Sequence, residues 1–241
     1  MMKKLVLAVA MLALVASPVL ADPATHVVGG QSIAPPAARD PVIYDNGLDY
    51  VGMAASQFDT VYDLEPILAD DFMLTAPNTI VTDVHWIGGY WNGDALPFDW
   101  EITFYADAAP FGAGPAAIIY QELFANANTN ETWIEDTANG SHFYSYDVTL
   151  AAPLDLVAGT TYWMSAQGIG DFPPQSGFAY HTDPITGSEA YFKSVYFGVP
   201  DWVPGNTVFG QQIDACFQLT GIPEPASLVL LTLAGLLIRR R

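Results

Sequence analysis

Carboxylates are the most numerous side chains in this sequence that could carry out chemistry, since Asp and Glu together number 26 in 241 residues. Asp70 and Asp71 open a predicted strand, and four further aspartates precede them in the chain: Asp45, Asp49, Asp59 and Asp63. Clustered carboxylate oxygens are the ligands that calcium prefers. The spacing matches no EF-hand, so solvated aspartates at strand ends are the alternative. Asp70 and Asp71 are therefore the candidate calcium ligands, and no other cofactor is expected.

Aromatic residues beside loops form the second group of candidates. An exposed ring can stack on the apolar face of a sugar while a nearby Asp or Asn binds the sugar hydroxyls. Trp91 precedes Asn92, and Trp202 follows Asp201. These two rings are the candidates for glycan stacking, and the alternative is that both belong to the core.

Recognised signatures of catalysis are missing from the sequence. It contains no G-x-S-x-G and no H-E-x-x-H, the patterns of many serine hydrolases and zinc enzymes. Carboxylates are so frequent that a pair at a glycosidase-like separation would arise by chance. Cys216, the only cysteine, has no base close to it in the sequence, as an activated thiolate would require. We expect a protein that is not an enzyme and name no catalytic residue.

The charges are distributed unevenly along the chain. Five of the seven basic residues lie at its two ends: Lys3, Lys4, Arg239, Arg240 and Arg241. Between Asp22 and Glu224, two basic residues stand against all 26 acidic ones, which gives a formal charge of −24. Such a surface repels phosphate backbones, so nucleic acid is excluded as a partner. A single cysteine also excludes an internal disulfide, so stability must come from the core.

Short strands separated by turns are the elements that must position the candidate residues. Residues 98–105 alternate apolar and largely polar side chains, which is the period of a strand with one buried face. Further strands are predicted at 71–74, 79–90, 118–124, 141–150, 161–166, 177–181, 190–196 and 213–220. No long amphipathic helix is predicted. The sequence therefore predicts an all-β fold, a single β-sandwich of jelly-roll type over residues 42–221.

Two segments precede the predicted sandwich. Residues 1–21 have a positive start at Lys3 and Lys4, an apolar run and a small-residue cleavage site, which is the pattern of a signal peptide. We predict cleavage between Ala21 and Asp22. An uncleaved anchor is the alternative, which the short apolar run disfavours. Residues 22–41, rich in Ala, Pro and Gly, are predicted to form a flexible leader.

The C-terminal segment, residues 222–241, also has three parts. Its first part is Pro223-Glu224-Pro225. Because both prolines lack a backbone donor and hold φ near −65°, this stretch is expected to be extended and exposed. A membrane protease could accept a segment of that shape.

The rest of this segment combines an apolar helix with terminal arginines. Residues 226–238 predict a short hydrophobic helix, about 20 Å long against a hydrocarbon core of about 30 Å. Arg239, Arg240 and Arg241 follow it and would stay in the cytoplasm. A buried helix of the globular domain is the alternative, but a helix apolar on every side suits a bilayer better. Its length suits a temporary hold in the membrane.

The tail resembles the PEP-CTERM sorting signal, which is found on exported proteins of Gram-negative bacteria that have an exosortase and usually make extracellular polysaccharide. The resemblance implies that Pro223-Glu224-Pro225 is the recognition and processing site and that an exosortase is the partner. It implies that residues 228–238 are a transient inner-membrane anchor, and that Arg239 to Arg241 act as the stop-transfer signal.

Segments of the predicted sandwich resemble the β-sandwich ectodomain that recurs in proteins bearing this tail. The segments are 69–72, 84–90, 102–107 and 214–220. The resemblance implies a carbohydrate-binding or matrix module. We therefore expect an exported cell-surface or extracellular-matrix protein, associated with biofilm and held at the inner membrane before processing. The alternative is a calcium-assisted module that binds extracellular polysaccharide, and a third possibility is a glycan-active enzyme.

Overall fold

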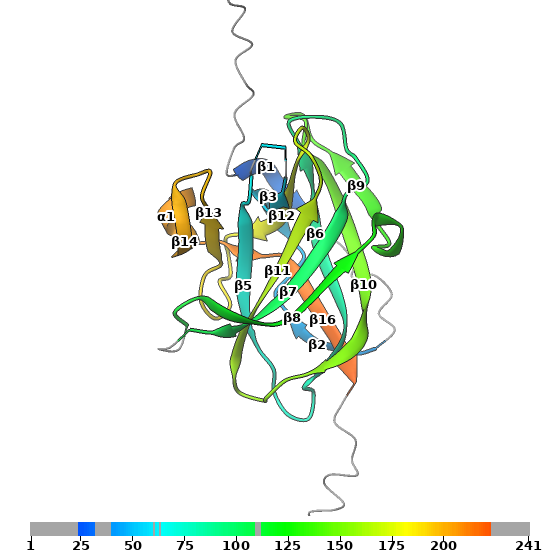
Figure 1. Cartoon of the computed structure of the whole chain (residues 1–241), viewed down its shortest axis with the longest axis vertical. Helices are drawn as coiled ribbons and strands as arrows, with labels where there is room; N and C mark the ends of the chain where they lie inside the picture. Colours follow the sequence, from blue (N-terminus) through cyan, green and yellow to red (C-terminus); the bar gives the residue numbers. More distant parts are fainter. Residues whose placement is uncertain (1–23, 32–39, 60, 63, 109–111, 223–241) are drawn as a thin grey trace, which may run out of the picture.

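The computed structural model describes residues 24–31, 40–59, 61–62, 64–108 and 112–222. Within them the chain folds into two β-sheets that face each other (Figure 1). All strand pairs are antiparallel except the short parallel pair of β4 and β11. The predicted all-β sandwich is therefore confirmed at this level.

The first sheet contains nine strands. They are β1 (Ala24–Gln31), β2 (Val42–Asp45), β3 (Tyr50–Ala55), β6 (Ile80–Trp91), β9 (Thr132–Asp136), β10 (His142–Asp155), β12 (Gln175–His181), β15 (Asp214–Ala215) and β16 (Phe217–Ile222). Its main order is β1-β3-β12-β6-β10-β9, with β15 beside β12, β16 beside β6 and β2 beside β16.

The second sheet contains seven strands, in the order β14-β13-β5-β11-β7-β8 with β4 beside β11. They are β4 (Gln57–Phe58), β5 (Ile67–Met73), β7 (Asp99–Asp107), β8 (Pro115–Phe124), β11 (Thr161–Ile169), β13 (Tyr191–Ser194) and β14 (Val199–Pro204). Two single turns of helix complete the described fold, η1 (Asn126–Asn128) and α1 (Gly205–Phe209).

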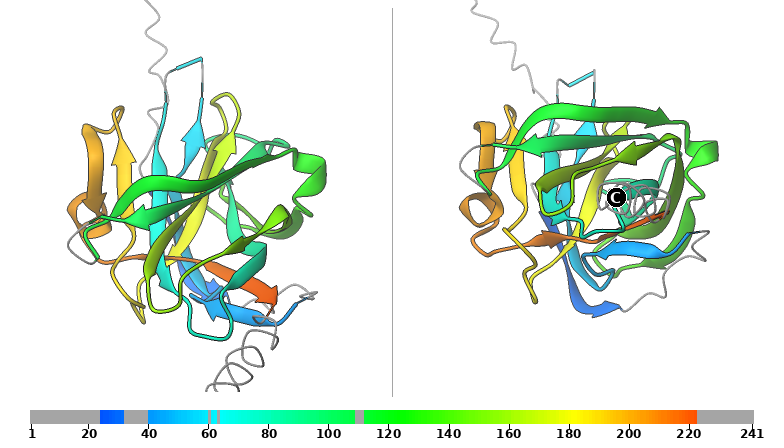
Figure 2. Two further views of the ribbon diagram at one scale, coloured as in Figure 1. Left: turned by 60° about the horizontal axis from the view of Figure 1, so that its bottom comes forward. Right: turned by 90° about the horizontal axis from the view of Figure 1, so that it is seen from below.

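Aromatic rings fill the space between the sheets. The right-hand view of Figure 2 shows the molecule from below, with β7 and β8 in green on one side and β16 in orange on the other. Trp86 of β6 stacks on Tyr146 of β10 with 4.9 Å between ring centroids. Trp100 of β7 reaches across from the second sheet to within 4.7 Å of the Tyr146 ring. Because Ala substitution of such a buried ring costs about 3–5 kcal/mol, this cluster holds the two sheets together.

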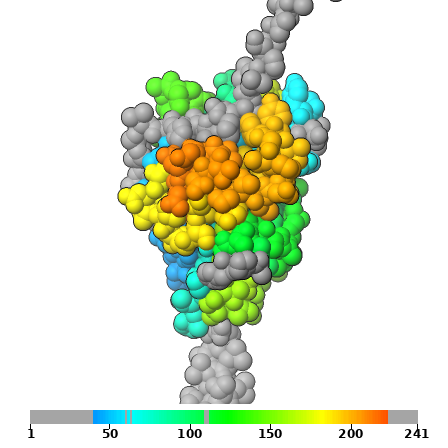
Figure 3. All heavy atoms as spheres, turned by 90° about the vertical axis from the view of Figure 1, so that its left-hand side faces the viewer, coloured from blue at the N-terminus to red at the C-terminus, as the bar shows by residue number. Residues whose placement is uncertain are grey.

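The alternation of residues 98–105 is confirmed for the inner face and modified for the outer one. Trp100, Ile102 and Phe104 are buried between the sheets as predicted. On the outer face Tyr105 is also buried, in a small cluster with Trp163 and Ala69. Tyr191 of β13 and Trp202 of β14 pack against this cluster. Figure 3 shows the segment from β12 to β15, in yellow to orange, on the side of the molecule that lies at the left in Figure 1.

The start of the fold differs from the sequence prediction. Residues 24–31 were predicted to belong to a flexible leader, but they form β1, which pairs antiparallel with β3. The Ala, Pro and Gly content of residues 22–41 carries no strand period, so local sequence could not reveal this pairing. The predicted signal peptide and the tail from Pro223 onward lie outside the described residues.

Candidate functional site

The site lies at the point along one edge of β6 where pairing with β12 ends and pairing with β16 begins. β12 pairs with the C-terminal part of β6, from Gly88 to Trp91, and β16 pairs with the N-terminal part, from Ile80 to Trp86. β3 continues the sheet beside β12, and β2 continues it beside β16. The turn of residues 46–49, which joins β2 to β3, therefore spans the junction. Strand pairing stops there, and side chains must satisfy the backbone groups.

Asn46 fills this junction and is buried. Its Nδ2 donates to Oδ2 of Asp70 at 2.8 Å and to the carbonyl oxygen of Ala215 at 2.9 Å. Its backbone N–H donates to the carbonyl of Phe217 at 3.0 Å, and its own carbonyl lies 2.6 Å from Nε2 of His181. The side chain and backbone of this one residue thus connect β5, β12 and the β15–β16 segment.

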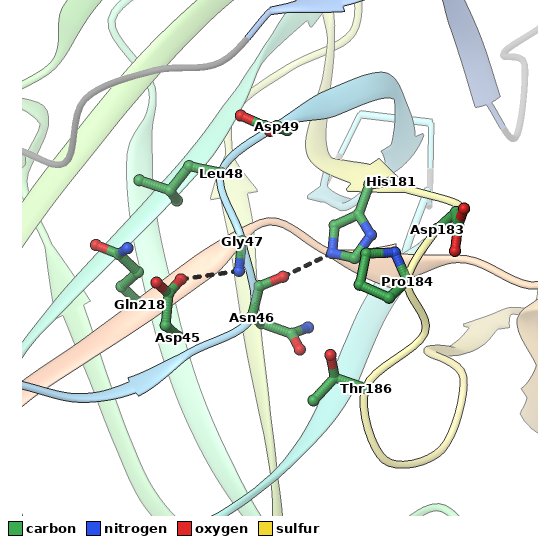
Figure 4. Close-up of a pocket in the computed structure, with 10 residues that line it drawn as sticks. All are labelled: Asp45, Asn46, Gly47, Leu48, Asp49, His181, Asp183, Pro184, Thr186 and Gln218. Carbon is green, nitrogen blue, oxygen red and sulfur yellow. Dashed lines mark hydrogen bonds between the residues drawn. The ribbon is translucent and has the colours of Figure 1, made fainter.

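A cleft of about 410 Å³ opens beside this junction. Its lining residues come from the 46–49 turn and its flanks, from the end of β12 and the loop behind it, and from β16: Asp45, Asn46, Gly47, Leu48, Asp49, His181, Asp183, Pro184, Thr186 and Gln218. Figure 4 shows Asp45 and Gln218 on one side of the turn, and His181, Asp183 and Pro184 on the other. The volume falls within the range of small-molecule sites.

Two buried side chains among the residues of the cleft lining each have one polar atom without a partner. His181 is 6% exposed and Gln218 is 4% exposed. Nε2 of His181 must be the donor toward the carbonyl of Asn46, because a carbonyl oxygen only accepts, and Nδ1 has no hydrogen bond. Oε1 of Gln218 is also unpaired. Leaving a buried polar group unpaired costs about 1–3 kcal/mol.

The rim of the cleft is acidic. Asp45, Asp49 and Asp183 are exposed lining residues, and neither Lys nor Arg is among the residues that line it. Oδ1 of Asp45 accepts the backbone N–H of Gly47 at 2.9 Å, which holds the turn in shape. The rim of the cleft therefore carries negative charge.

Asp70 lies between the sheets beneath this cleft and is fully buried. Besides Asn46, it accepts the backbone N–H groups of Ala215 at 2.6 Å and Asp71 at 2.9 Å. Burial raises its pKa well above the usual range, and the charges of Asp214 and Asp71 raise it further. Its carboxylate ties β5 to the strand junction, which is a structural role.

Two more carboxylates hold the loop that forms one wall of the cleft. Asp214 accepts the N–H of Thr186 at 2.5 Å, and Asp71 accepts the N–H of Ser188 at 2.9 Å. Burial raises the pKa of Asp71 to about 6 and that of Asp214 to about 7. Because the N–H groups belong to the loop between β12 and β13, the position of this wall depends on the two carboxylates.

The structure shows no arrangement of Asp70 and Asp71 that matches the predicted calcium site. Asp70 and Asp71 are successive strand residues, so their side chains leave opposite faces of β5, and each carboxylate is engaged with backbone N–H groups. Among the residues that the structure describes, no group of three or more His, Cys, Asp or Glu is placed to hold a metal ion. The two aspartates are therefore not brought together as a pair of ligands.

The two tryptophans predicted to stack on a glycan differ in their surroundings. Trp91 is the last residue of β6 and only 4% exposed, so its ring belongs to the core and the prediction for it is wrong. Trp202 of β14 is partly exposed, but its ring lies 5.7 Å from the Tyr105 ring and 5.9 Å from the ammonium of Lys193. A sugar on the ring face that Lys193 covers would have to displace this cation.

Trp133 of β9 is the exposed ring that the structure offers instead. It is 57% exposed, and its Nε1 donates to Oδ1 of Asp136 at 3.1 Å. The same oxygen lies 2.7 Å from Nδ1 of His142, and hydrogen bonds from His142 and Trp133 lower the pKa of Asp136. Trp133 does not line the cleft.

Sequence reasoning did not single out Asn46, His181 or Gln218 as site residues. They lie far apart in the chain, on β2–β3, β12 and β16, and only strand pairing brings them together. No local spacing could have found them. Cys216, beside them, is fully buried, and burial raises the pKa of its thiol well above the usual range, in keeping with an unreactive side chain.

The predicted sorting residues are not described by the structure. Ala21 and Asp22, the motif Pro223-Glu224-Pro225, and Arg239 to Arg241 all lie outside the described residues. Within the part of the chain that is described, no helix is long and apolar enough to cross a membrane.

Fold and cleft together define the class: a mainly antiparallel β-sandwich protein with an acidic cleft at a strand junction. The chain belongs to the DUF7901 family, a domain of unknown function, whose model matches residues 34–220. The match includes every residue that lines the cleft. No curated protein and no solved structure matches the chain.

Proposed function

We propose that the protein is exported and acts outside the cell as a non-enzymatic surface or matrix protein. The observation that carries the proposal is the C-terminal sequence, in which Pro223-Glu224-Pro225, an apolar stretch and three arginines follow one another. The pattern of residues 1–21, with cleavage after Ala21, supports it at the other end. The acidic middle of the chain supports it too, because self-repulsion keeps such a protein soluble.

The proposed route has three steps. The signal peptide directs the chain through the general secretory route and is removed. Arg239 to Arg241 remain in the cytoplasm because of the positive-inside rule, so residues 226–238 hold the precursor at the inner membrane. An exosortase then acts at Pro223-Glu224-Pro225, and the mature protein reaches the cell surface or the extracellular matrix.

Variants of the tail test this route. Glu224→Ala removes the charged residue of the motif, and deletion of residues 239–241 removes the cytoplasmic stop. We expect the first to retain its tail and the second to escape membrane retention, both seen as a changed mass or location of the product. Asp94→Asn, an exposed aspartate of the sandwich, is the matched control. Unchanged processing in both tail variants would rule the route out.

Carbohydrate binding by the sandwich is the second candidate function. The specific observation that favours it is the cleft of about 410 Å³ with Asp45, Asp49 and Asp183 in its lining, because exposed carboxylates accept hydrogen bonds from sugar hydroxyls. We also propose that the two sheets follow a jelly-roll-like arrangement, as in many carbohydrate-binding modules, although fold alone does not determine function.

A glycan array with and without a calcium chelator tests this second function. Binding of extracellular polysaccharide fragments in either condition would support a carbohydrate-binding module, and loss of binding with chelator would support calcium assistance. An absence of binding in both conditions would count against the function. Hydrolysis of any polysaccharide on the panel would contradict the non-enzymatic assignment.

A further inference from the structure

One end of the sandwich is the end at which its last strand finishes. β16 ends at Ile222, whose register partner is Ile80 at the start of β6. We call this end the tail end and define it by residues 41–42, 73–80, 156–161 and 221–222. We propose that the tail end lies against the lipid headgroups of the inner membrane while the precursor is held there. The inference rests on the proposed export route and specifies which face of the sandwich meets the membrane.

The four segments of the tail end are neighbours in the fold. The loop of residues 156–160 donates two backbone hydrogen bonds to the loop of residues 74–79. The N–H of Gly221 donates to the carbonyl of Pro41 at 3.1 Å. Figure 1 shows β16 and both loops reaching the bottom of the molecule. Together the segments make one continuous end of the sandwich.

The tether between this end and the proposed membrane segment is short. Three residues, 223–225, separate Ile222 from the apolar stretch of residues 226–238 in the sequence. Three residues span at most about 11 Å when fully extended. The long strand β6 has twelve residues, which span about 40 Å. While residues 226–238 are held in the bilayer, the tail end therefore stays within reach of the headgroups, and the opposite end can lie far from them.

The distribution of charge favours the same orientation. The four segments contain no Asp, Glu, Lys or Arg, although the chain between Asp22 and Glu224 carries a formal charge of −24. Asp40 and Asp155 flank them in the sequence. Loops at the opposite end, before β5 and after β6 and β11, carry exposed acidic residues: Glu65, Asp94 and Asp171. Because anionic lipids repel acidic side chains within about a Debye length, the tail end is the face that approaches such a membrane most easily.

Exposed apolar side chains at the tail end can contribute to the contact. Val157 is 65% exposed, Val42 and Met73 are 43% exposed, and Ile222 is 39% exposed. Such side chains can enter the boundary between headgroups and acyl chains. Exposed apolar residues also occur at the opposite end, where Leu96 is an example. The short tether and the absence of charge are therefore what select the tail end.

Fluorescence quenching in vesicles tests this orientation. The precursor, residues 22–241, is inserted into vesicles of phosphatidylethanolamine and phosphatidylglycerol that contain a lipid with a spin-labelled headgroup as the quencher. A fluorescent label is attached at Val157→Cys, and at Leu96→Cys as the matched control at the opposite end. Cys216 is buried, so it should stay unlabelled. We expect the label at position 157 to be quenched several-fold more strongly than the label at position 96.

Added charge tests the electrostatic part of the inference. Thr160→Glu places an acidic side chain at an exposed position of the tail end. It should shift the equilibrium between docked and undocked sandwich about fivefold toward the undocked form, as expected for one charge near an anionic surface, and added salt should reduce this effect. Ala138→Glu, also at an exposed position but in the loop between β9 and β10, should leave the quenching unchanged. Equal quenching in the two variants would contradict the role of charge.

The outcomes separate this inference from the route on which it rests. A precursor that does not bind the vesicles would contradict both the membrane hold by residues 226–238 and this inference. A precursor that binds them with equal quenching at positions 157 and 96, or with stronger quenching at position 96, would overturn the orientation and leave the route in place. Shielding of position 157 only in vesicles that also contain an exosortase would assign the face to the enzyme and overturn the lipid contact.

Discussion

Asp214 gives the sharpest test of how the buried carboxylates act. Its side chain is buried, its Oδ2 accepts the N–H of Thr186, and its Oδ1 has no partner. Burial raises its pKa from 3.8 to about 7, and the charges of Asp71 and Glu189 add to the rise. Asp214→Asn keeps an acceptor for Thr186 but cannot ionise. The variant therefore isolates the effect of the charge.

The sign of the effect follows from proton linkage. Between about pH 4 and pH 7 the folded protein retains a proton on Asp214 that the unfolded chain has lost, so stability falls as pH rises through this window. A pKa difference of one corresponds to about 1.4 kcal/mol, so the rise to about 7 sets an upper limit of about 4 kcal/mol. Because the loop that Asp214 holds can move and hydrate the charge, we expect about half of this, ~2 kcal/mol.

Urea unfolding followed by tryptophan fluorescence at pH 4, 6 and 8 measures this difference. The wild type should lose stability across the series, and Asp214→Asn should lose ~2 kcal/mol less, so that it is the more stable protein at pH 8. Asp94→Asn, which removes one exposed charge, should follow the wild type. Equal pH dependence in the wild type and Asp214→Asn would refute the assignment of a buried, ionising Asp214.

Three further changes test other parts of the structure. Gly89→Ala should destabilise the fold by about 2 kcal/mol or more, because a Cβ there would lie 1.9 Å from the carbonyl oxygen of His142; an unchanged urea midpoint would contradict the close approach of β6 and β10. Trp100→Ala should lower the free energy of unfolding by about 3–5 kcal/mol, while the exposed Trp133→Ala should change it by about 0.5 kcal/mol or less. Similar unfolding midpoints for the two variants would argue against the assignment of Trp100 to the core. Cys216 is buried with a raised thiol pKa and should react with a thiol reagent only in denaturant, so rapid labelling of the native protein would count against its burial.

Strand positions could be predicted where local pattern decides them. Alternation at residues 98–105 located β7, and turn residues separated the predicted strands of β5, β6, β10, β11 and β12. β9 and β14 were missed because they are short and partly exposed, with no clean alternation. The burial of Tyr105 on the outer face of β7 could not be predicted either, because Tyr191 and Trp202, which pack on its cluster, come from a distant part of the chain.

The candidate site depended on pairings that no local pattern reveals. Asp70 was predicted as a calcium ligand because several aspartates precede it and could converge on a cation, yet N–H groups from Ala215 and Asp71 and the amide of Asn46 surround it. Trp91 was predicted to be exposed because a turn follows it, although it is the last residue of β6 and faces the core. In both cases, residues far away in the sequence help to surround the side chain. A single sequence does not show which strands are neighbours in the sheet.

The mass of the mature protein tests the central proposal of export and tail processing most directly. The measurement is intact-mass spectrometry of the protein recovered from the surface and medium of a producing bacterium with an active exosortase, with terminal peptides identified. We predict a chain that begins at Asp22 and lacks residues 226–241. A product that retains Arg239 to Arg241, or one that begins at Met1, would contradict the proposal.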